Sequence, residues 1–259
     1  MTGHVAFVGA GPGAADLITV RGAARLAQAD VVLFDALTDP ALRGLAPRAR
    51  WIDVGKRGFA DSTGQATINA LLVRHANEGR VVVRLKGGDP SVFGRLEEEL
   101  QALAQAGVAC EVVPGVTAAL AAAAATRRPL TRRGVGRSVS LATAMTREGR
   151  LQATRTADTE VFYMAGRQLA ALSRRLLAAG WPAATPVCVV SRAGGPDQRE
   201  SDHTVLDLAR AAVLHAGRPT VVTVGAGAVA LSAVTDAAMS PTRSYGPATL
   251  GRGIGQRLS

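Results

Sequence analysis

The stretch that most constrains the fold is a valine run at positions 81–83 that leads directly into the sequence RLKGGDP, followed by a helical pattern over about residues 91–106. β-branched residues favour a strand, so a strand here ends in a glycine pair and a carboxylate. Open α/β sheets bind ligands beyond the carboxyl ends of their strands, and glycine lets a ligand approach the main chain without a Cβ in the way. The pattern predicts a ligand site at Gly87, Gly88 and Asp89.

Apolar β-branched runs alternate with amphipathic stretches along the whole chain, which predicts an α/β fold with mostly parallel sheets covered by helices. The expected strands are residues 4–8, 31–34, 51–54, 81–85, 108–113, 138–143, 161–164, 187–191 and 220–224. The expected helices are residues 20–28 behind a Thr19 N-cap, 67–77, 91–106, 118–125, 168–179 and 205–214.

The same pattern predicts two domains. Residues 1–113 are expected to form an N-terminal α/β domain, 114–137 an interdomain segment that begins with a Pro-Gly pair, and 138–240 a C-terminal α/β domain. Residues 241–259 are rich in Pro, Gly, Ser, Thr and Arg with little apolar periodicity, so they are expected to form a flexible tail.

The charge is strongly positive. The formal net charge is +10, and only Lys56 and Lys86 among the 30 basic residues are lysines. Such a charge suits nucleic acid, an anionic membrane surface or a small polycarboxylate. The arginines are scattered, apart from the pairs at 127–128 and 132–133, which favours a compositional bias. The aromatic content of 3% argues against a stacking platform for nucleic-acid bases.

The cysteines, histidines and apolar runs bear on disulfides, metal sites and membrane segments. Cys110 and Cys188 lie in apolar strand-like runs, which predicts buried thiols in a reducing compartment. The four histidines have no metal-ligand spacing with each other or with the cysteines, so no metal site is expected. The chain shows neither a secretory signal nor an apolar run long enough for a membrane span, which predicts a cytoplasmic protein without a membrane partner.

A second glycine loop, residues 9–14, follows the first expected strand and fits the spacing G-x-G-x-x-A, with Asp35 placed 21 residues further on. This spacing imitates a dinucleotide fingerprint and leaves a nicotinamide-dependent oxidoreductase as an alternative. Pro12 removes a backbone N–H from the loop, Asp16 adds negative charge, and the helix begins only after Thr19.

Asp89 in the first glycine loop favours a ligand without phosphates. Its carboxylate would repel pyrophosphate but would suit a ribose hydroxyl or an ammonium group. S-adenosylmethionine offers both of these groups.

Several segments, taken in order, closely resemble the uroporphyrinogen-III C-methyltransferase family of tetrapyrrole methylases. They are VGAGPG at 8–13, FDAL at 34–37, VGKR at 54–57, RLKGGDPSVFGR at 84–95, VPGVTA at 113–118, PLT at 129–131 and FYM at 162–164. The combination of VGKR with RLKGGDPSVFGR is the most distinctive part, and the resemblance extends over about residues 5–224.

The resemblance implies a homodimer of two α/β domains with the methyl donor in the cleft between them. It implies transfer of two methyl groups from S-adenosylmethionine to ring carbons of uroporphyrinogen III, giving precorrin-2 for sirohaem or cobalamin synthesis. Electron-rich pyrroles attack the methyl group themselves, so the protein mainly aligns the reactants and manages a proton loss. A related methyltransferase that acts on a later corrin precursor is the nearest alternative.

The resemblance also assigns residues. Asp35 matches the family's proton acceptor and Lys56 its proton donor. The donor-binding positions correspond to Pro12, Gly87, Gly88, Asp89, Val92, Thr117, Ala118, Met164 and Ala193. The substrate is a polycarboxylate, for which candidate partners are Arg57, Arg95, Arg128, Arg132 and Arg133. The chain departs from the family at Arg132, where histidine is common, and at Thr143-Ala144-Met145, where Thr-Gly-His is common.

Overall fold

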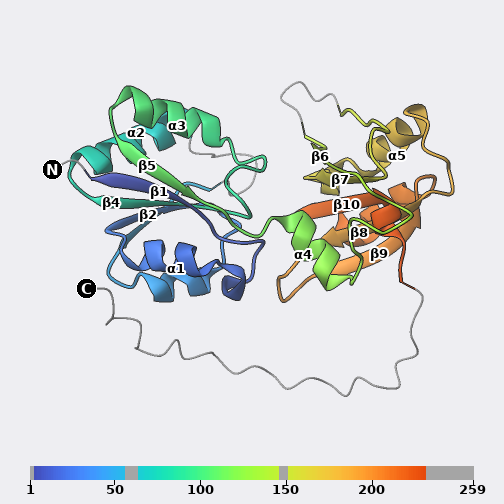
Figure 1. Cartoon of the computed structure of the whole chain (residues 1–259), viewed down its shortest axis with the longest axis horizontal. Helices are drawn as coiled ribbons and strands as arrows, with labels where there is room; N and C mark the ends of the chain where they lie inside the picture. The colour runs from blue at the N-terminus through green and yellow to red at the C-terminus, as the bar shows by residue number, and fades with distance from the viewer. Residues whose placement is uncertain (1–2, 56–63, 146–150, 232–259) are drawn as a thin grey trace, which may run out of the picture.

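The computed structural model describes residues 3–55, 64–145 and 151–231. Two lobes lie side by side in Figure 1, each built on a five-stranded sheet, with helix α4 (Ala118–Ala125) between them. The predicted α/β class with two sheets is therefore confirmed. The tail predicted for 241–259 lies outside the described residues, and the exact domain limits stay a prediction.

The first sheet is entirely parallel, with the strand order β3-β2-β4-β1-β5. Its strands are β1 (His4–Gly9), β2 (Val31–Phe34), β3 (Arg50–Asp53), β4 (Val81–Lys86) and β5 (Ala109–Val113). Its helices are α1 (Val20–Ala27), α2 (Gln65–Asn77) and α3 (Leu96–Gln105), together with the short 3-10 helices η1 (Ala15–Leu17) and η2 (Pro40–Leu45).

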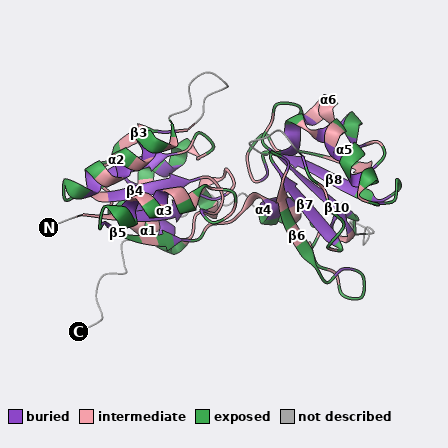
Figure 2. Ribbon diagram, turned by 90° about the horizontal axis from the view of Figure 1, so that it is seen from above, coloured by how far each residue is buried: buried purple, intermediate pink, exposed green. Residues whose placement is uncertain are grey.

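Side-chain alternation explains why the central strands β1, β2 and β4 are mostly apolar. In β1, Val5 and Phe7 pack in the core beneath α2 and α3, whereas Ala6 and Val8 pack in the core beneath α1. Figure 1 shows the same arrangement, with α2 and α3 on one face of the sheet and α1 on the other. The central strands of a sheet covered on both faces are mostly apolar, and Figure 2 shows β4 in purple, as buried.

The second sheet has the order β6-β7-β10-β8-β9. Its strands are β6 (Val139–Thr143), β7 (Thr159–Tyr163), β8 (Pro186–Ser191), β9 (Arg199–Thr204) and β10 (Thr220–Gly225). Its other helices are α5 (Leu169–Ala178), α6 (Ala212–His215), η3 (Ala165–Arg167), η4 (Leu208–Ala211) and η5 (Ala226–Ala228). Helices α4 and α5 cover its two faces, because Val161 and Tyr163 of β7 pack with α4, and Phe162 packs with α5.

The parallel pairing predicted for this second sheet is wrong. Only β6 and β7 pair in parallel, whereas β10 is antiparallel to both β7 and β8, and β9 is antiparallel to β8. Strand β9 was not expected, because its sequence RESDHT lacks an apolar run. Its edge position explains this composition, since an edge strand tolerates polar, solvated side chains.

Two further differences have local causes. Helix α3 begins at Leu96 and not near residue 91, because Phe93 and Arg95 have φ angles of 53° and 54°, which interrupt a right-handed helix. Cys188 is buried as predicted, but Cys110 is exposed. It lies on β5, an edge strand of the first sheet.

Candidate functional site

Three glycine loops meet at the carboxyl ends of β1, β4 and β5. The N–H of Gly88 donates to the carbonyl of Gly11 at 2.7 Å, and the N–H of Gly11 donates back to Gly88 at 3.3 Å. A Cβ on Gly9 would lie 2.5 Å from the Cα of Gly115, and one on Gly115 would lie 2.4 Å from the Gly88 oxygen. Only glycine permits such close approach of three main chains.

This packing weakens the dinucleotide alternative. A pyrophosphate needs several backbone N–H groups that point at it. In the loop at 9–14, the amide of Gly11 is already bonded to Gly88, and Pro12 has no amide hydrogen. The loop therefore packs against its neighbour and does not present a row of donors to an anion.

Asp89 ties two of these loops together. One carboxylate oxygen accepts a hydrogen bond from the Ser91 amide at 2.8 Å, and the other accepts from the Gly115 amide at 2.9 Å. The sequence indicated a direct role for this carboxylate toward a ligand. In the structure its two main-chain bonds hold the loop after β4 against the loop after β5, so its first effect is to shape the site.

Asp35 lies at the end of β2, beside the same glycine loop. Its carboxylate accepts from the Arg84 guanidinium at 2.6 Å and from the Gly87 amide at 3.4 Å. The Asp35 side chain is 31% exposed, whereas that of Arg84 is 4% exposed. Asp35 is therefore a reachable carboxylate that a buried cation holds in place.

Behind Asp35 lies a buried charge network that the sequence analysis missed. Glu99, fully buried on α3, accepts from Arg84 Nε at 2.9 Å and from Lys86 Nζ at 2.6 Å. Burial works to lower the pKa of Arg84, but the charges of Asp35 and Glu99 outweigh it and raise that pKa. Burial, and then the charge of Arg84, lower the pKa of Lys86.

A sequence signal for this network existed. Arg84 and Lys86 are two residues apart on β4, so their side chains leave the strand on the same face. Three consecutive glutamates, residues 97–99, open the helix that follows. Two cations on one face of a buried strand require carboxylates from the covering helix.

The second lobe reaches this site through Tyr163, at the end of β7. Its hydroxyl lies 2.8 Å from the Thr117 hydroxyl, and its ring contacts Phe93 with centroids 5.1 Å apart. Burial is the main cause that raises the pKa of Tyr163, so it remains a neutral phenol. Met164 follows with a φ of 57°, a left-handed conformation that turns the chain sharply at this edge.

A second contact between the lobes comes from the loop after β8. A Cβ on Gly194 would lie 3.3 Å from Pro12 Cγ, so this loop sits against the loop after β1. Ala193 is buried in the cluster that contains Tyr163, and Val92 and Ala118 pack against that cluster. The structure thus brings together residues from both lobes that the family resemblance assigns to the donor: Pro12, Gly87, Gly88, Asp89, Val92, Thr117, Ala118, Met164 and Ala193. Lys56, the expected proton donor, lies outside the described residues, just beyond the end of β3.

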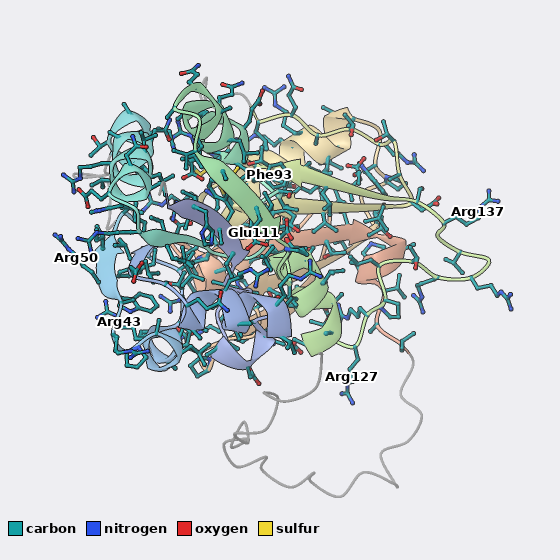
Figure 3. All side chains as sticks on the ribbon, turned by 60° about the vertical axis from the view of Figure 1, so that its left-hand side comes forward. Arg43, Arg50, Phe93, Glu111, Arg127 and Arg137 are labelled. Carbon is teal, nitrogen blue, oxygen red and sulfur yellow. The ribbon has the colours of Figure 1, made fainter. Side chains whose placement is uncertain are left out.

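Three of the five arginines proposed for the substrate have protein partners. Arg95 pairs with Glu98 at 2.6 Å, Arg128 donates to Asp202 at 2.8 Å, and Arg132 donates to the carbonyl of Val229 at 3.4 Å. Arg133 is exposed, and Arg57 lies outside the described residues. Figure 3 shows Arg43 and Arg50 at one end of the molecule and Arg137 at the other, in agreement with scattered charge.

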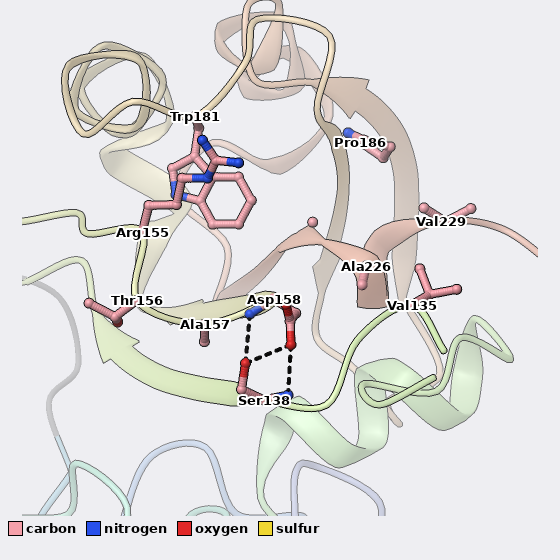
Figure 4. A pocket seen from close by; sticks show the side chains of 11 residues that line it. Val135, Ser138, Arg155, Thr156, Ala157, Asp158, Trp181, Pro186, Ala226 and Val229 are labelled. Atoms are coloured by element: carbon pink, nitrogen blue, oxygen red, sulfur yellow. Dashed lines mark hydrogen bonds between the residues drawn. The ribbon is translucent and has the colours of Figure 1, made fainter. Parts of the chain in front are cut away.

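An open cavity of about 480 Å³ lies elsewhere, at the amino ends of β6 and β7, and Figure 4 shows its lining. Arg155 stacks over the Trp181 ring there, 5.4 Å from its centroid. Asp158 is engaged by the hydroxyl and amide of Ser138 and by the Arg137 amide, and these bonds lower its pKa. The polar side chains of Arg155 and Asp158 are engaged in hydrogen bonds within the second lobe.

The described residues contain no group of three or more His, Cys, Asp or Glu side chains arranged to hold a metal ion. Within the same residues, every helix is too short or too polar to cross a bilayer.

Comparison with known sequences identifies relatives. The sequence profile of the tetrapyrrole (corrin/porphyrin) methylases matches residues 4–209. Over 214 residues the chain is 44% identical to a uroporphyrinogen-III C-methyltransferase of Pseudomonas aeruginosa, covering 81% of this chain and 87% of that protein. It is 46% identical over 212 residues to siroheme synthase 1 of Pectobacterium atrosepticum, covering 80% of this chain but only 44% of that longer protein.

Solved structures of related proteins share the fold of this chain. A uroporphyrin-III C-methyltransferase of Thermus thermophilus superposes with a TM-score of 0.76 at 39% identity, covering 88% of this chain and 94% of that one. A Thermus thermophilus complex with S-adenosylhomocysteine gives a TM-score of 0.75 at 35% identity, covering 86% and 97%. With its profile match, its sequence identity and its two-sheet fold all in agreement, the chain belongs to the tetrapyrrole (corrin/porphyrin) methylase family.

Proposed function

We propose that this chain transfers two methyl groups from S-adenosylmethionine to ring carbons of uroporphyrinogen III, giving precorrin-2. The observation that carries the proposal is the junction of glycine loops beside a reachable carboxylate, Asp35. A Cβ added to Gly87 would meet nothing closer than Leu37 Cβ at 3.6 Å, so the main chain there is open to a ligand. The relatives named above support the choice of donor and of substrate.

In this proposal the protein aligns the reactants. S-adenosylmethionine supplies an electrophilic methyl group when bound, and the bare main chain of Gly87 and Gly88 admits it. A ring carbon of the substrate forms the new bond while the sulfur–methyl bond breaks, with the electron pair left on sulfur. Asp35 then accepts the proton that the methylated ring loses. Arg84 holds the Asp35 carboxylate in place at the end of β2, because the two groups are bonded at 2.6 Å.

Asp35→Asn tests this assignment. An amide cannot accept the proton but keeps the size of the side chain, so we expect turnover to fall by about 10²- to 10⁴-fold. Calorimetry should show S-adenosylhomocysteine binding within about threefold of wild type, because the glycine loop stays intact.

Asp30→Asn is the matched control. Asp30 directly precedes β2, at the end of the strand opposite Asp35, and its carboxylate also accepts a main-chain hydrogen bond, from the Val81 amide at 2.8 Å. Its substitution should leave turnover unchanged. Wild-type turnover in Asp35→Asn would remove this carboxylate from the mechanism.

Further parts of the proposal rest on the family resemblance. Lys56 is the proton donor, the nine donor-binding residues contact S-adenosylmethionine, and the enzyme works as a homodimer in the cytoplasm. Sedimentation at several concentrations tests the oligomeric state.

A methyltransferase for a later corrin precursor is the second candidate. A cobalt-precorrin-4 methyltransferase superposes with a TM-score of 0.76 at 30% identity, and Arg132 departs from the pattern of the first family. Product mass separates the two. Incubation with enzymatically generated uroporphyrinogen III and the donor should give a dimethylated product, and an unchanged substrate would favour the later precursor.

A further inference from the structure

The loop after β8, residues 192–198, is held at its base by polar groups that the proposed methyl transfer does not use. Ser191, the last residue of β8, is fully buried, and its hydroxyl accepts from Arg218 Nε at 2.9 Å. The same guanidinium donates to the carbonyl oxygen of Asp197 and to its carboxylate, the latter at 3.3 Å. Arg192 pairs with that carboxylate at 3.4 Å. Arg218 therefore joins both ends of the loop.

A chain of hydrogen bonds continues from Ser191 into the core. Its hydroxyl lies 2.9 Å from His215 Nδ1, and His215 Nε2 lies 2.9 Å from the Ser201 hydroxyl, which in turn lies 2.8 Å from His203 Nε2. Arginine only donates, so the Ser191 hydroxyl accepts from Arg218. The four side chains Ser191, His215, Ser201 and His203 form one continuous chain of hydrogen bonds beneath the loop.

The loop itself has a shape that needs support. Arg192 adopts a φ of 51°, which is unfavourable for a residue with a Cβ and persists only where the surroundings enforce it. Within the loop, the Gly194 amide donates to the Gln198 side chain at 2.9 Å, and the Gly195 amide donates to the Arg192 carbonyl at 2.9 Å. The tip at Gly194 is the part that packs against Pro12 of the first lobe.

We infer that Arg218 is a positioning residue, which acts through Ser191 and Asp197 to hold the 192–198 loop against Pro12 and so sets the affinity for the methyl donor. The inference rests on the proposed function, in which Ala193 and Pro12 border the donor. Arg218 bonds to Ser191 and Asp197, which are not among the residues assigned to the donor, so its loss should weaken donor binding more than it slows the bound reactants.

The test compares Arg218→Gln with Arg155→Gln in the full chain. Arg155 is a matched control, because it lies in the same lobe and also donates to a backbone carbonyl, that of Gly180 at 2.8 Å, but beside the separate cavity. Calorimetry measures the dissociation constant of S-adenosylhomocysteine, and steady-state assays give KM and kcat. Hydrogen exchange measures protection of residues 192–198 without any ligand, and thermal unfolding shows that each variant is folded.

For Arg218→Gln we expect a dissociation constant about tenfold higher, a KM for S-adenosylmethionine raised in proportion, and kcat within about twofold of wild type. Exchange should rise in the 192–198 loop of this variant alone. Asp197→Asn, which keeps the carbonyl but loses the charge, should fall between wild type and Arg218→Gln.

Three results would overturn the inference in different ways. Wild-type affinity and loop protection in Arg218→Gln would remove its positioning role while leaving the proposed function intact. An equal loss in Arg155→Gln would make the effect one of general stability. Failure of the wild-type protein itself to bind S-adenosylhomocysteine would overturn the proposed function, and this inference with it.

Discussion

At the scale of single residues, the buried His215 makes the stability of the protein depend on pH. It is fully buried, and burial, together with the charges of His203, Arg218 and Arg199, lowers its pKa from 6.5 to about 4. Between these values the unfolded chain binds a proton that the folded protein does not, so stability falls as the pH drops from 6.5 toward 4. We expect the wild-type protein to lose about 2 kcal/mol more of unfolding free energy between pH 7 and pH 5 than His215→Gln does. Urea unfolding at both pH values checks this, and equal losses would contradict it.

At the scale of elements, the loops after β1, β4 and β5 are close-packed main chains. Gly115→Ala places a Cβ 2.4 Å from the Gly88 carbonyl oxygen, a backbone atom that cannot move aside cheaply. We expect it to lower the free energy of unfolding by about 3 kcal/mol, measured in urea. In Gly87→Ala the new Cβ meets only Leu37 Cβ at 3.6 Å, so stability should stay near wild type while S-adenosylhomocysteine binding weakens. Equal stability of the two variants would show that the junction is looser than its distances indicate.

At the scale of the whole molecule, Tyr163 of the second lobe makes two contacts: its ring packs on Phe93 of the first lobe, and its hydroxyl bonds to Thr117, where α4 begins. Tyr163→Phe removes the hydroxyl bond and keeps the ring contact. We expect a loss of about 1 kcal/mol in unfolding free energy and a severalfold weaker S-adenosylhomocysteine affinity, since Thr117 belongs to the proposed donor site. Phe93→Leu, which removes the ring contact and leaves the hydroxyl, separates the two contributions. Unchanged affinity in Tyr163→Phe would show that the hydroxyl does not help to shape the site.

Many helices, strands and glycine loops of this molecule can be predicted from short stretches of its sequence. The central strands β1 and β2 are apolar runs because helices cover both faces of the sheet. The N-cap predicted at Thr19 is confirmed, because its hydroxyl accepts from the Gly22 amide at 3.0 Å. The glycine loops and Asp35 were predicted at strand ends because a parallel sheet gathers those ends at one edge. Periodicity, caps and glycine placement act within a few residues, so they are legible in the chain itself.

Other features were decided only when distant segments met. The direction of β10 and the existence of β9 depend on which strands become neighbours, and the local pattern of a strand does not encode its partner. The two bonds of Asp89 to main-chain amides and the burial of Glu99 beneath Arg84 and Lys86 depend on distances across the fold. From sequence alone came most of the helices and strands, the family and the positions of the glycine loops. The tertiary structure alone decided which carboxylates shape the site and which one faces it, because desolvation and hydrogen bonding are set by neighbours that lie far away along the chain.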